Sequence, residues 1–343
     1  MTDNSRINWL GGRMAEEGAE ILLVLSQAFH NFQEINPVMV LSGFKNLGNA
    51  AALLGADGSL TVMVSPAWDG DRARERAPGA KVLASDDLAG TVIKELKKAK
   101  GKIGVAGINS MPARIAGPIR DRLGDRALNM DQTMVLAGAC KTEAEIARAR
   151  TMAEVAEKCF DRMLEFTHPG RFEFELAAEL YRYSKELGAD DNFLLITASQ
   201  SNKAPRAAGR RVLEEGDLIL GEITPGADGQ FVQICRSAVV GPISPIQQAD
   251  YDLLWKSMER GMETALPGRT VAEVTRAMDQ VIIDGGYGEY CRPPYMRVRG
   301  HGLGSISHLP GDIGTDNHME LEEGMIFVMH PNQYLLGSGY LLC

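Results

Sequence analysis

Histidines gather near the end of this sequence, in a segment that could carry out chemistry. Four of the six histidines, His301, His308, His318 and His330, fall between residues 300 and 332. The run HGLGSISH, which begins at His301, is glycine-rich and is a poor helix former. Because imidazole titrates near neutral pH and also binds metals, such a cluster indicates acid–base or metal chemistry. The alternative is that these histidines are ordinary surface or core residues.

A carboxylate stands within an apolar run further upstream. Glu222 lies in the segment LILGEIT at residues 218–224, which has the composition of a buried strand. A carboxylate in that position is costly unless it is paired or used. We therefore interpret Glu222 as a candidate nucleophile or general base. The alternative is that its side chain points outward at the end of the strand.

The segment that follows, residues 230–240, is expected to return as the second strand of a hairpin. Its alternation places Gln233 and Cys235 on one face and Arg236 on the other. Cys235 is a weaker candidate nucleophile, because a free cysteine on a strand is most often a core residue.

The elements around these residues are helix pairs and strands. Thr142 and Glu145 match a capping box at the start of a long helix. Apolar spacing predicts helices at 141–164, 172–187, 249–265 and 271–285, and strands at 192–198, 218–223, 230–240, 325–329 and 340–343.

The N-terminal part predicts a separate α/β domain. Strands at 21–25, 38–41, 60–64 and 102–105 alternate with helices at 13–20 and 84–99, which favours a parallel-type sheet. The pattern changes near Cys140. We therefore expect an α/β domain at 1–138 and a second domain at 139–343.

Composition excludes several classes of protein. The net charge is −9, and no basic stripe with interleaved aromatic residues appears, so no nucleic-acid partner is expected. No apolar run reaches the roughly 18 residues of a membrane span, and the N-terminus lacks the apolar core of a signal peptide. Five widely spaced cysteines without a CxxC pair should be free thiols. A cytoplasmic protein without a membrane partner is expected.

The order of these motifs resembles the creatinase, prolidase and aminopeptidase P family. The resemblance rests on GDLILGEI, QICRS, GHGLGSISH and LEEGMIFVMHPNQY, and it covers roughly residues 140–343. It implies the pita-bread fold, an α+β domain with a curved antiparallel sheet and outer helices, after an α/β N-terminal domain. It also implies a homodimer that acts on a small-molecule substrate.

The same resemblance implies a metal centre that this sequence does not preserve. Metal-dependent members hold two divalent ions with two aspartates, a histidine and two glutamates. Four of the corresponding positions carry Glu222, Gln233, His301 and His330. The fifth position, that of the second glutamate, falls at or just beyond Cys343, so the chain is expected to be truncated relative to its relatives. One anionic oxygen ligand cannot replace four for two hard cations. We expect no cofactor; the alternative is one or two ions of Mn, Zn or Co, with Glu222, His301 and His330 as ligands.

Within the family, the substitutions look closer to creatinase or ectoine hydrolase than to the metallopeptidases. The expected function is metal-independent hydrolysis of a carbon–nitrogen bond in a small amide, amidine or cyclic compound. One alternative is an Xaa-Pro aminopeptidase or dipeptidase with an atypical metal site, and another is a catalytically silent binding member.

The expected roles follow from residue chemistry. Glu222 would be the nucleophile or general base, and His301 and His308 would protonate the departing nitrogen. His330 would orient one of these histidines or bind the substrate. The substrate contacts are expected from the remaining polar side chains around the hairpin, which are Gln233, Cys235, Arg206 and Arg236.

Overall fold

A computed structural model describes residues 4–27 and 34–343 of the chain. These residues form two compact units. The first runs to Cys140 and includes the short segment Gly304–His308, and the second comprises Lys141–Leu303 and Leu309–Cys343. The expected boundary lies between residues 138 and 139. No helix in the described ranges has both the length and the apolar character needed to cross a membrane.

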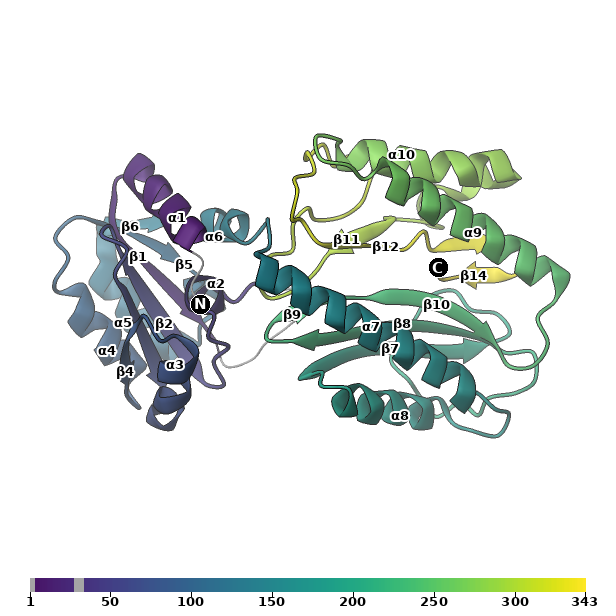
Figure 1. The fold of residues 1–343 in the computed structure, drawn as a ribbon, viewed down its shortest axis with the longest axis horizontal. Helices are drawn as coiled ribbons and strands as arrows, with labels where there is room; N and C mark the ends of the chain where they lie inside the picture. Colours follow the sequence, from purple (N-terminus) through teal and green to yellow (C-terminus); the bar gives the residue numbers. More distant parts are fainter. Residues whose placement is uncertain (1–3, 28–33) are drawn as a thin grey trace. The chain divides into compact units, whose positions relative to one another are not determined.

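The first unit is built on one six-stranded sheet. Its strands are β1 (Ala19–Ser26), β2 (Asn49–Gly55), β3 (Leu60–Ser65), β4 (Lys81–Ala84), β5 (Lys102–Ala106) and β6 (Ala127–Asn129), and its helices include α1 (Asn4–Glu17), α2 (Pro37–Ser42), α3 (Gly70–Arg76), α4 (Leu88–Leu96), α5 (Ala113–Leu123) and α6 (Asp131–Ala137). The strand order is β4-β3-β2-β1-β5-β6 (Figure 1).

This sheet is mixed, so the expectation of a parallel-type sheet was wrong in part. β1 and β5, β5 and β6, and β3 and β4 pair in parallel, whereas β2 is antiparallel to both of its neighbours. The strand expected at 38–41 is helix α2 instead. The Asn36 side chain accepts a hydrogen bond from Met39 N, and Pro37 begins the helix.

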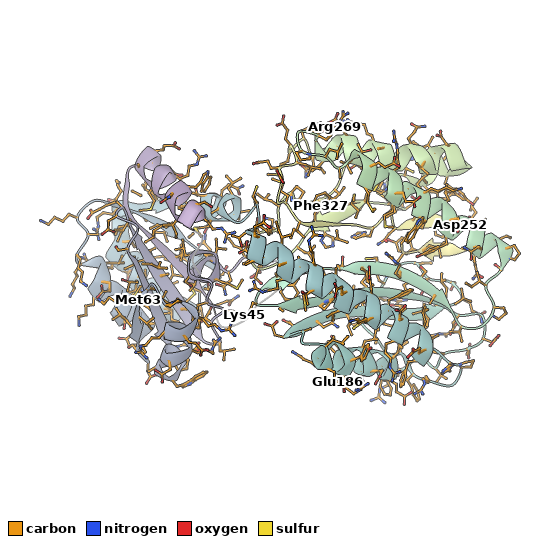
Figure 2. The ribbon with its side chains drawn as sticks, in the orientation of Figure 1. Lys45, Met63, Glu186, Asp252, Arg269 and Phe327 are labelled. Atoms are coloured by element: carbon orange, nitrogen blue, oxygen red, sulfur yellow. The ribbon has the colours of Figure 1, made fainter. Side chains whose placement is uncertain are left out.

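Alternating residues of the strands fill an apolar core on each face of this sheet. Leu22 and Val24 of β1 pack in the cluster that includes α1 and α2, while Leu23 and Leu25 pack in the cluster that includes α4 and α5. Met63 of β3, labelled in Figure 2, is fully buried in the second cluster. Because successive side chains of a strand point to opposite faces of the sheet, one apolar core layer lies on each face.

The second unit contains two helix pairs and several antiparallel strands. Its helices are α7 (Glu143–Phe166), α8 (Glu173–Glu186), α9 (Pro245–Thr264) and α10 (Val271–Ile282), and its strands are β7 (Asp191–Ser199), β8 (Leu218–Ala227), β9 (Gln230–Phe231), β10 (Ile234–Val239), β11 (Gly300–Gly302), β12 (Phe327–Met329), β13 (Gln333–Leu335) and β14 (Gly339–Leu341). Thr142 caps α7 in the capping box with Glu145 that the sequence predicts.

The strands form three antiparallel groups rather than one continuous sheet. The order β10-β8-β7 makes the main sheet, with β9 paired to β8, and β11–β12 and β13–β14 are separate pairs. Figure 1 shows α7 and α8 on one side of these strands and α9 and α10 on the other. The face of the main sheet opposite α7 and α8 is therefore enclosed within the unit. We call it the inner face.

Candidate active site

Glu222 lies on the inner face of the main sheet. Ile219 and Ile223 of β8 pack in the cluster with α7 and α8, while Leu218 and Leu220 pack in the cluster with α9 and the C-terminal strands. By the alternation of a strand, Glu222 shares the face of Leu218 and Leu220. The carboxylate is half-buried within the unit, and it does not point outward as the alternative interpretation supposed.

The Glu222 carboxylate has no polar partner among the described residues. Burial raises the pKa of Glu222 to about 7, and no neighbouring positive charge or hydrogen bond lowers it. The group therefore titrates near neutral pH, in the range that suits a general base.

Burial of this carboxylate predicts pH-dependent stability. The pKa of Glu222 is raised from 4.5 to about 7, so its ionisation opposes folding increasingly between these pH values. We expect Glu222→Gln to match the wild type in free energy of unfolding at pH 4.5. At pH 8 we expect the variant to be more stable by up to about 3 kcal/mol. Urea unfolding at both pH values measures this difference.

Glu179 provides a matched control with the opposite sign. Hydrogen bonds and charge from Arg182 and Arg162 lower the pKa of Glu179 to about 2. Its stabilising contribution is present above pH 4.5 and is lost as the pH falls toward 2. Glu179→Gln should therefore destabilise the protein at pH 8. If both variants shift stability in the same direction at pH 8, the account of Glu222 is contradicted.

His301 and His330 come from adjacent strand segments of the second unit. β11 pairs with β12 so that His301 lies opposite Val328, and His330 N donates to Arg299 O at 2.9 Å. The two rings meet edge to face, with centroids 5.2 Å apart. Burial and the neighbouring His301 lower the pKa of His330 to about 3, so His330 is neutral at physiological pH. The structure thus brings together two of the predicted histidines.

A buried arginine holds the backbone that carries these histidines. The Arg299 guanidinium is fully buried; Nε donates to Asp279 of α10 at 2.7 Å, and Nη1 donates to Gln333 Oε1 at 3.0 Å and to Asn332 O at 3.2 Å. Arg299 therefore ties α10 to the segment that follows His330. Arg299 was not among the predicted site residues, because its partners Asp279 and Gln333 are distant in sequence.

Two further polar residues near Glu222 were also missed. Burial and the charge of Glu222 raise the pKa of Tyr340 to about 12, and the Asn332 side chain opposes this shift. Gln233, which the sequence did predict, donates through Nε2 to Thr224 Oγ1 at 3.0 Å. The neighbourhood of Glu222 is thus made largely of neutral polar side chains.

His308 is the third of the predicted histidines. It belongs to the first unit, where it lines a cavity of about 290 Å³ together with Asn36 and Asp131. His301 belongs to the second unit, so the predicted pairing of His301 with His308 is not found within either unit.

Cys235 does not suit either role proposed for it. It lies opposite Glu222 in the β8–β10 register, but it is 1% exposed and packs in the cluster with Leu220 and Leu254. Burial raises the pKa of the thiol well above its ordinary value, which disfavours the thiolate.

Of the two predicted arginines, Arg236 is half-buried against helix α9 and Arg206 is exposed. Arg236 lies over the ring of Trp255 at 5.6 Å and donates to Cys235 O. Arg206 is exposed in a loop, where its backbone N donates to Thr197 Oγ1 at 2.6 Å. Neither contact identifies a substrate-binding role for these arginines.

The residues at the expected metal-ligand positions do not fit a pair of divalent metal ions. The positions offer one carboxylate, the amide of Gln233 and the imidazoles of His301 and His330, whereas hard cations require several anionic oxygens. Across residues 4–27 and 34–343, no three His, Cys, Asp or Glu side chains are placed so that they could hold a metal ion. The trio Glu222, His301 and His330 proposed as an alternative is therefore not assembled as a metal site.

A sequence profile of metallopeptidase family M24 matches residues 147–340 of the chain. The chain belongs to metallopeptidase family M24. The fold of this M24 chain is the pita-bread fold that the motifs predicted. Solved structures agree: it superposes on prolidase from Pyrococcus furiosus with a TM-score of 0.82 at 22% identity, covering 97% of this chain and 94% of that chain. Prolidase from Pyrococcus horikoshii gives 0.84 at 22% identity, covering 98% and 93%.

The curated relatives of this M24 chain are peptidases. It is 27% identical to the Xaa-Pro dipeptidase of Pyrococcus furiosus over 198 residues, which are 57% of this chain and 56% of that protein. It is 29% identical to the probable dipeptidase PepE of Mycobacterium tuberculosis over 240 residues, which are 68% and 62%. The chain thus spans somewhat more than half the length of the relatives it matches. These relatives do not support the expected leaning toward creatinase or ectoine hydrolase.

Proposed function

We propose that this M24 chain hydrolyses the carbon–nitrogen bond of a small peptide-like substrate, with an Xaa-Pro dipeptide as the first candidate. Membership of the family and the names of its relatives, Xaa-Pro dipeptidase and dipeptidase, support a peptide over the small amide, amidine or cyclic compound expected from the substitutions. The family is one of metallopeptidases, but the residues at the expected ligand positions do not fit two metal ions, so the proposed reaction uses side chains alone.

The observation that carries this proposal is the Glu222 carboxylate, which has no ion pair or hydrogen bond to any described side chain and lies on the inner face. At pH values above about 7 it is ionised and can take a proton from water. The resulting hydroxide attacks the carbonyl carbon of the peptide bond. Collapse of the tetrahedral intermediate then breaks the carbon–nitrogen bond.

His301 supplies a second proton-transfer group. Its Nδ1 lies 3.0 Å from Gly302 O, and since a carbonyl only accepts, Nδ1 carries a proton. Nε2 is left to exchange a proton with the departing amine. The proton that Glu222 takes from water is returned to that nitrogen, directly or through Nε2 of His301, so the reaction is balanced.

The test is release of free proline from Ala-Pro and Leu-Pro, with Ala-Ala as the comparison substrate. We expect proline release by the wild-type chain and a rate for Ala-Ala that is lower. Release of small amines from simple amides instead would favour the substrate class expected from the substitutions. Absence of turnover on every substrate would contradict the proposal and favour a silent binding member.

A further inference from the structure

A cavity of about 530 Å³ lies in the first unit, at the edge of the sheet where β3 and β4 end. These two strands pair in parallel, so their carboxyl ends open on the same edge. Ligands of open α/β sheets bind outside the carboxyl ends of the strands, and small-molecule pockets have volumes of about 300–1,000 Å³. Position and size therefore both suit a small molecule. We call this space, lined by Trp68, Asp86 and Arg114 among others, the carboxyl-edge cavity.

Trp68 gives the carboxyl-edge cavity an aromatic wall. Trp68 is 66% exposed, more than any other Phe, Tyr or Trp in the described ranges, and it makes no ring contact or hydrogen bond with another described residue. Leu47, which is 56% exposed, adds apolar surface to the same lining. Contact of this surface with water is unfavourable, so an apolar or aromatic ligand group is favoured here.

Arg114 brings a positive charge to the cavity. It stands in the first turn of α5, and no ion pair or hydrogen bond joins it to any residue that the structure describes. Pro112 precedes this helix and provides no side-chain cap, so the first backbone N–H groups of α5 remain available. A carboxylate at this point would meet both the guanidinium, which can bind it with two hydrogen bonds, and the positive end of the helix dipole.

Asp86 brings a negative charge to the same cavity. Its Oδ1 accepts from Ala67 N at 2.9 Å, and its backbone oxygen accepts from Ser65 Oγ at 3.4 Å. These bonds fix Asp86 beside the segment that carries Trp68. No Lys or Arg pairs with Asp86 in the described part of the chain, and a carboxylate can accept further donors. Asp86 is therefore available to an ammonium group.

Backbone packing forms the cavity in advance of any ligand. Gly48 lies so close to the end of β3 that a Cβ atom on it would be 2.0 Å from Ser65 O. On the other side, Asp87 caps α4, where its side chain accepts from Gly90 N at 2.9 Å. The walls are thus held by the fold itself, which lowers the entropic cost of binding.

Other classes of ligand fit the carboxyl-edge cavity less well. A phosphate dianion would face the carboxylates of Asp86 and Asp87 with one arginine to offset them. A divalent cation would be repelled by Arg114, and within residues 4–27 and 34–343 no three His, Cys, Asp or Glu side chains are placed to hold a metal. One charge of each sign beside an aromatic wall matches a zwitterion with an apolar side chain.

We propose that the carboxyl-edge cavity binds a free α-amino acid with an apolar or aromatic side chain. Its carboxylate pairs with Arg114, its ammonium group pairs with Asp86, and its side chain lies against Trp68. Every lining residue belongs to the first unit, whereas Glu222 and His301 belong to the second, so this site goes beyond the proposed hydrolysis. Hydrolysis of dipeptides would also release ligands of this class.

Calorimetric titration of the full chain at pH 7 tests the proposal with four probes. L-phenylalanine carries all three groups, whereas phenethylamine lacks the carboxylate, 3-phenylpropionate lacks the ammonium and glycine lacks the side chain. We expect L-phenylalanine to bind at least about tenfold more tightly than each of the others, because each of them loses a charge-assisted pair or the contact with the indole ring.

Variants assign each group of the ligand to its residue. Arg114→Met should remove the preference for L-phenylalanine over phenethylamine, and Asp86→Asn should remove the preference over 3-phenylpropionate. Asparagine keeps an oxygen that can accept from Ala67 N, so the loop should persist. Trp68→Ala should weaken binding of L-phenylalanine about tenfold and leave that of glycine unchanged.

Two matched controls lie in the same unit. Arg120→Met removes an exposed arginine from the same helix, where Arg120 donates to Asn109 Oδ1 at 2.8 Å outside the carboxyl-edge cavity. Trp9→Ala removes a tryptophan of α1 that is 40% exposed and stacks with Arg13 at 5.4 Å. Both controls should bind L-phenylalanine as the wild type does.

Several outcomes would overturn the proposal. These are the absence of saturable L-phenylalanine binding, equal binding of the four probes, and equal weakening by Arg114→Met and Arg120→Met. Loss of L-phenylalanine binding in Glu222→Gln would also overturn it, because the ligand would then occupy the candidate active site. Proline release without L-phenylalanine binding would refute only this inference, and binding without proline release would refute only the hydrolysis.

Discussion

Replacement of Glu222 by glutamine is expected to lower the rate of Xaa-Pro dipeptide hydrolysis by more than about 100-fold. Glutamine keeps the size and polarity of the side chain but cannot accept the proton from water. Because Glu222 has no ion pair within the described part of the chain, the substitution breaks no structural contact and the fold should persist. Initial rates of proline release at pH 8, together with the unfolding midpoint of each protein, measure both effects.

Glu179→Gln makes the same chemical change outside the site. Glu179 lies on α8 and is paired with Arg162 and Arg182, so its loss should affect stability and leave the rate per folded molecule within a few-fold of the wild type. A Glu222→Gln variant that retains a tenth or more of the wild-type rate would rule out Glu222 as the general base.

Replacement of Arg299 by methionine is expected to lower the free energy of unfolding by about 3–5 kcal/mol. The guanidinium is 0% exposed, and its removal leaves Asp279 as a buried charge without its partner. It also removes the donor to Gln333 Oε1 and Asn332 O, which support the segment after His330. Urea unfolding at pH 7 measures the loss.

Arg269→Met is the matched control on the adjoining turn. Arg269 pairs with Glu273 at 3.0 Å, but its side chain is 57% exposed, so its loss should cost less than about 1 kcal/mol. The double variant Arg299→Met, Asp279→Leu should recover part of the stability, since no charge is then left buried and unpaired. Equal effects of Arg299→Met and Arg269→Met would contradict the structural role assigned to Arg299.

Local signals explain which elements of the fold could be predicted. The capping box of Thr142 and Glu145 depends only on residues within one helical turn, and the structure contains it. A short apolar run such as residues 38–41 fits a buried strand and a buried helix equally well, so the predicted strand was wrong. Asn36 and Pro37 were the available helix signals. β2 (Asn49–Gly55) was missed because alanine and glycine have low strand propensity, and its place is set by antiparallel pairing on both sides.

The site residues that could be predicted are those with titratable side chains in an unusual sequence context. Glu222 stood out as a carboxylate in an apolar run, and His301 and His330 stood out by residue type. Asn332, Tyr340 and Arg299 were not predictable, because their contacts depend on the register of strands only three residues long and on distant helix α10. His308 belongs to the first unit and His301 to the second, and sequence proximity does not show which unit a segment joins.

The most direct measurement is the rate of Xaa-Pro dipeptide hydrolysis before and after exhaustive treatment with a chelator, with Glu222→Gln as the blank. The account predicts that chelation leaves the wild-type rate unchanged, because Glu222 and His301 carry the proton transfers. A rate that falls on chelation and returns with Mn²⁺, Co²⁺ or Zn²⁺ would contradict it and would make Glu222, His301 and His330 metal ligands.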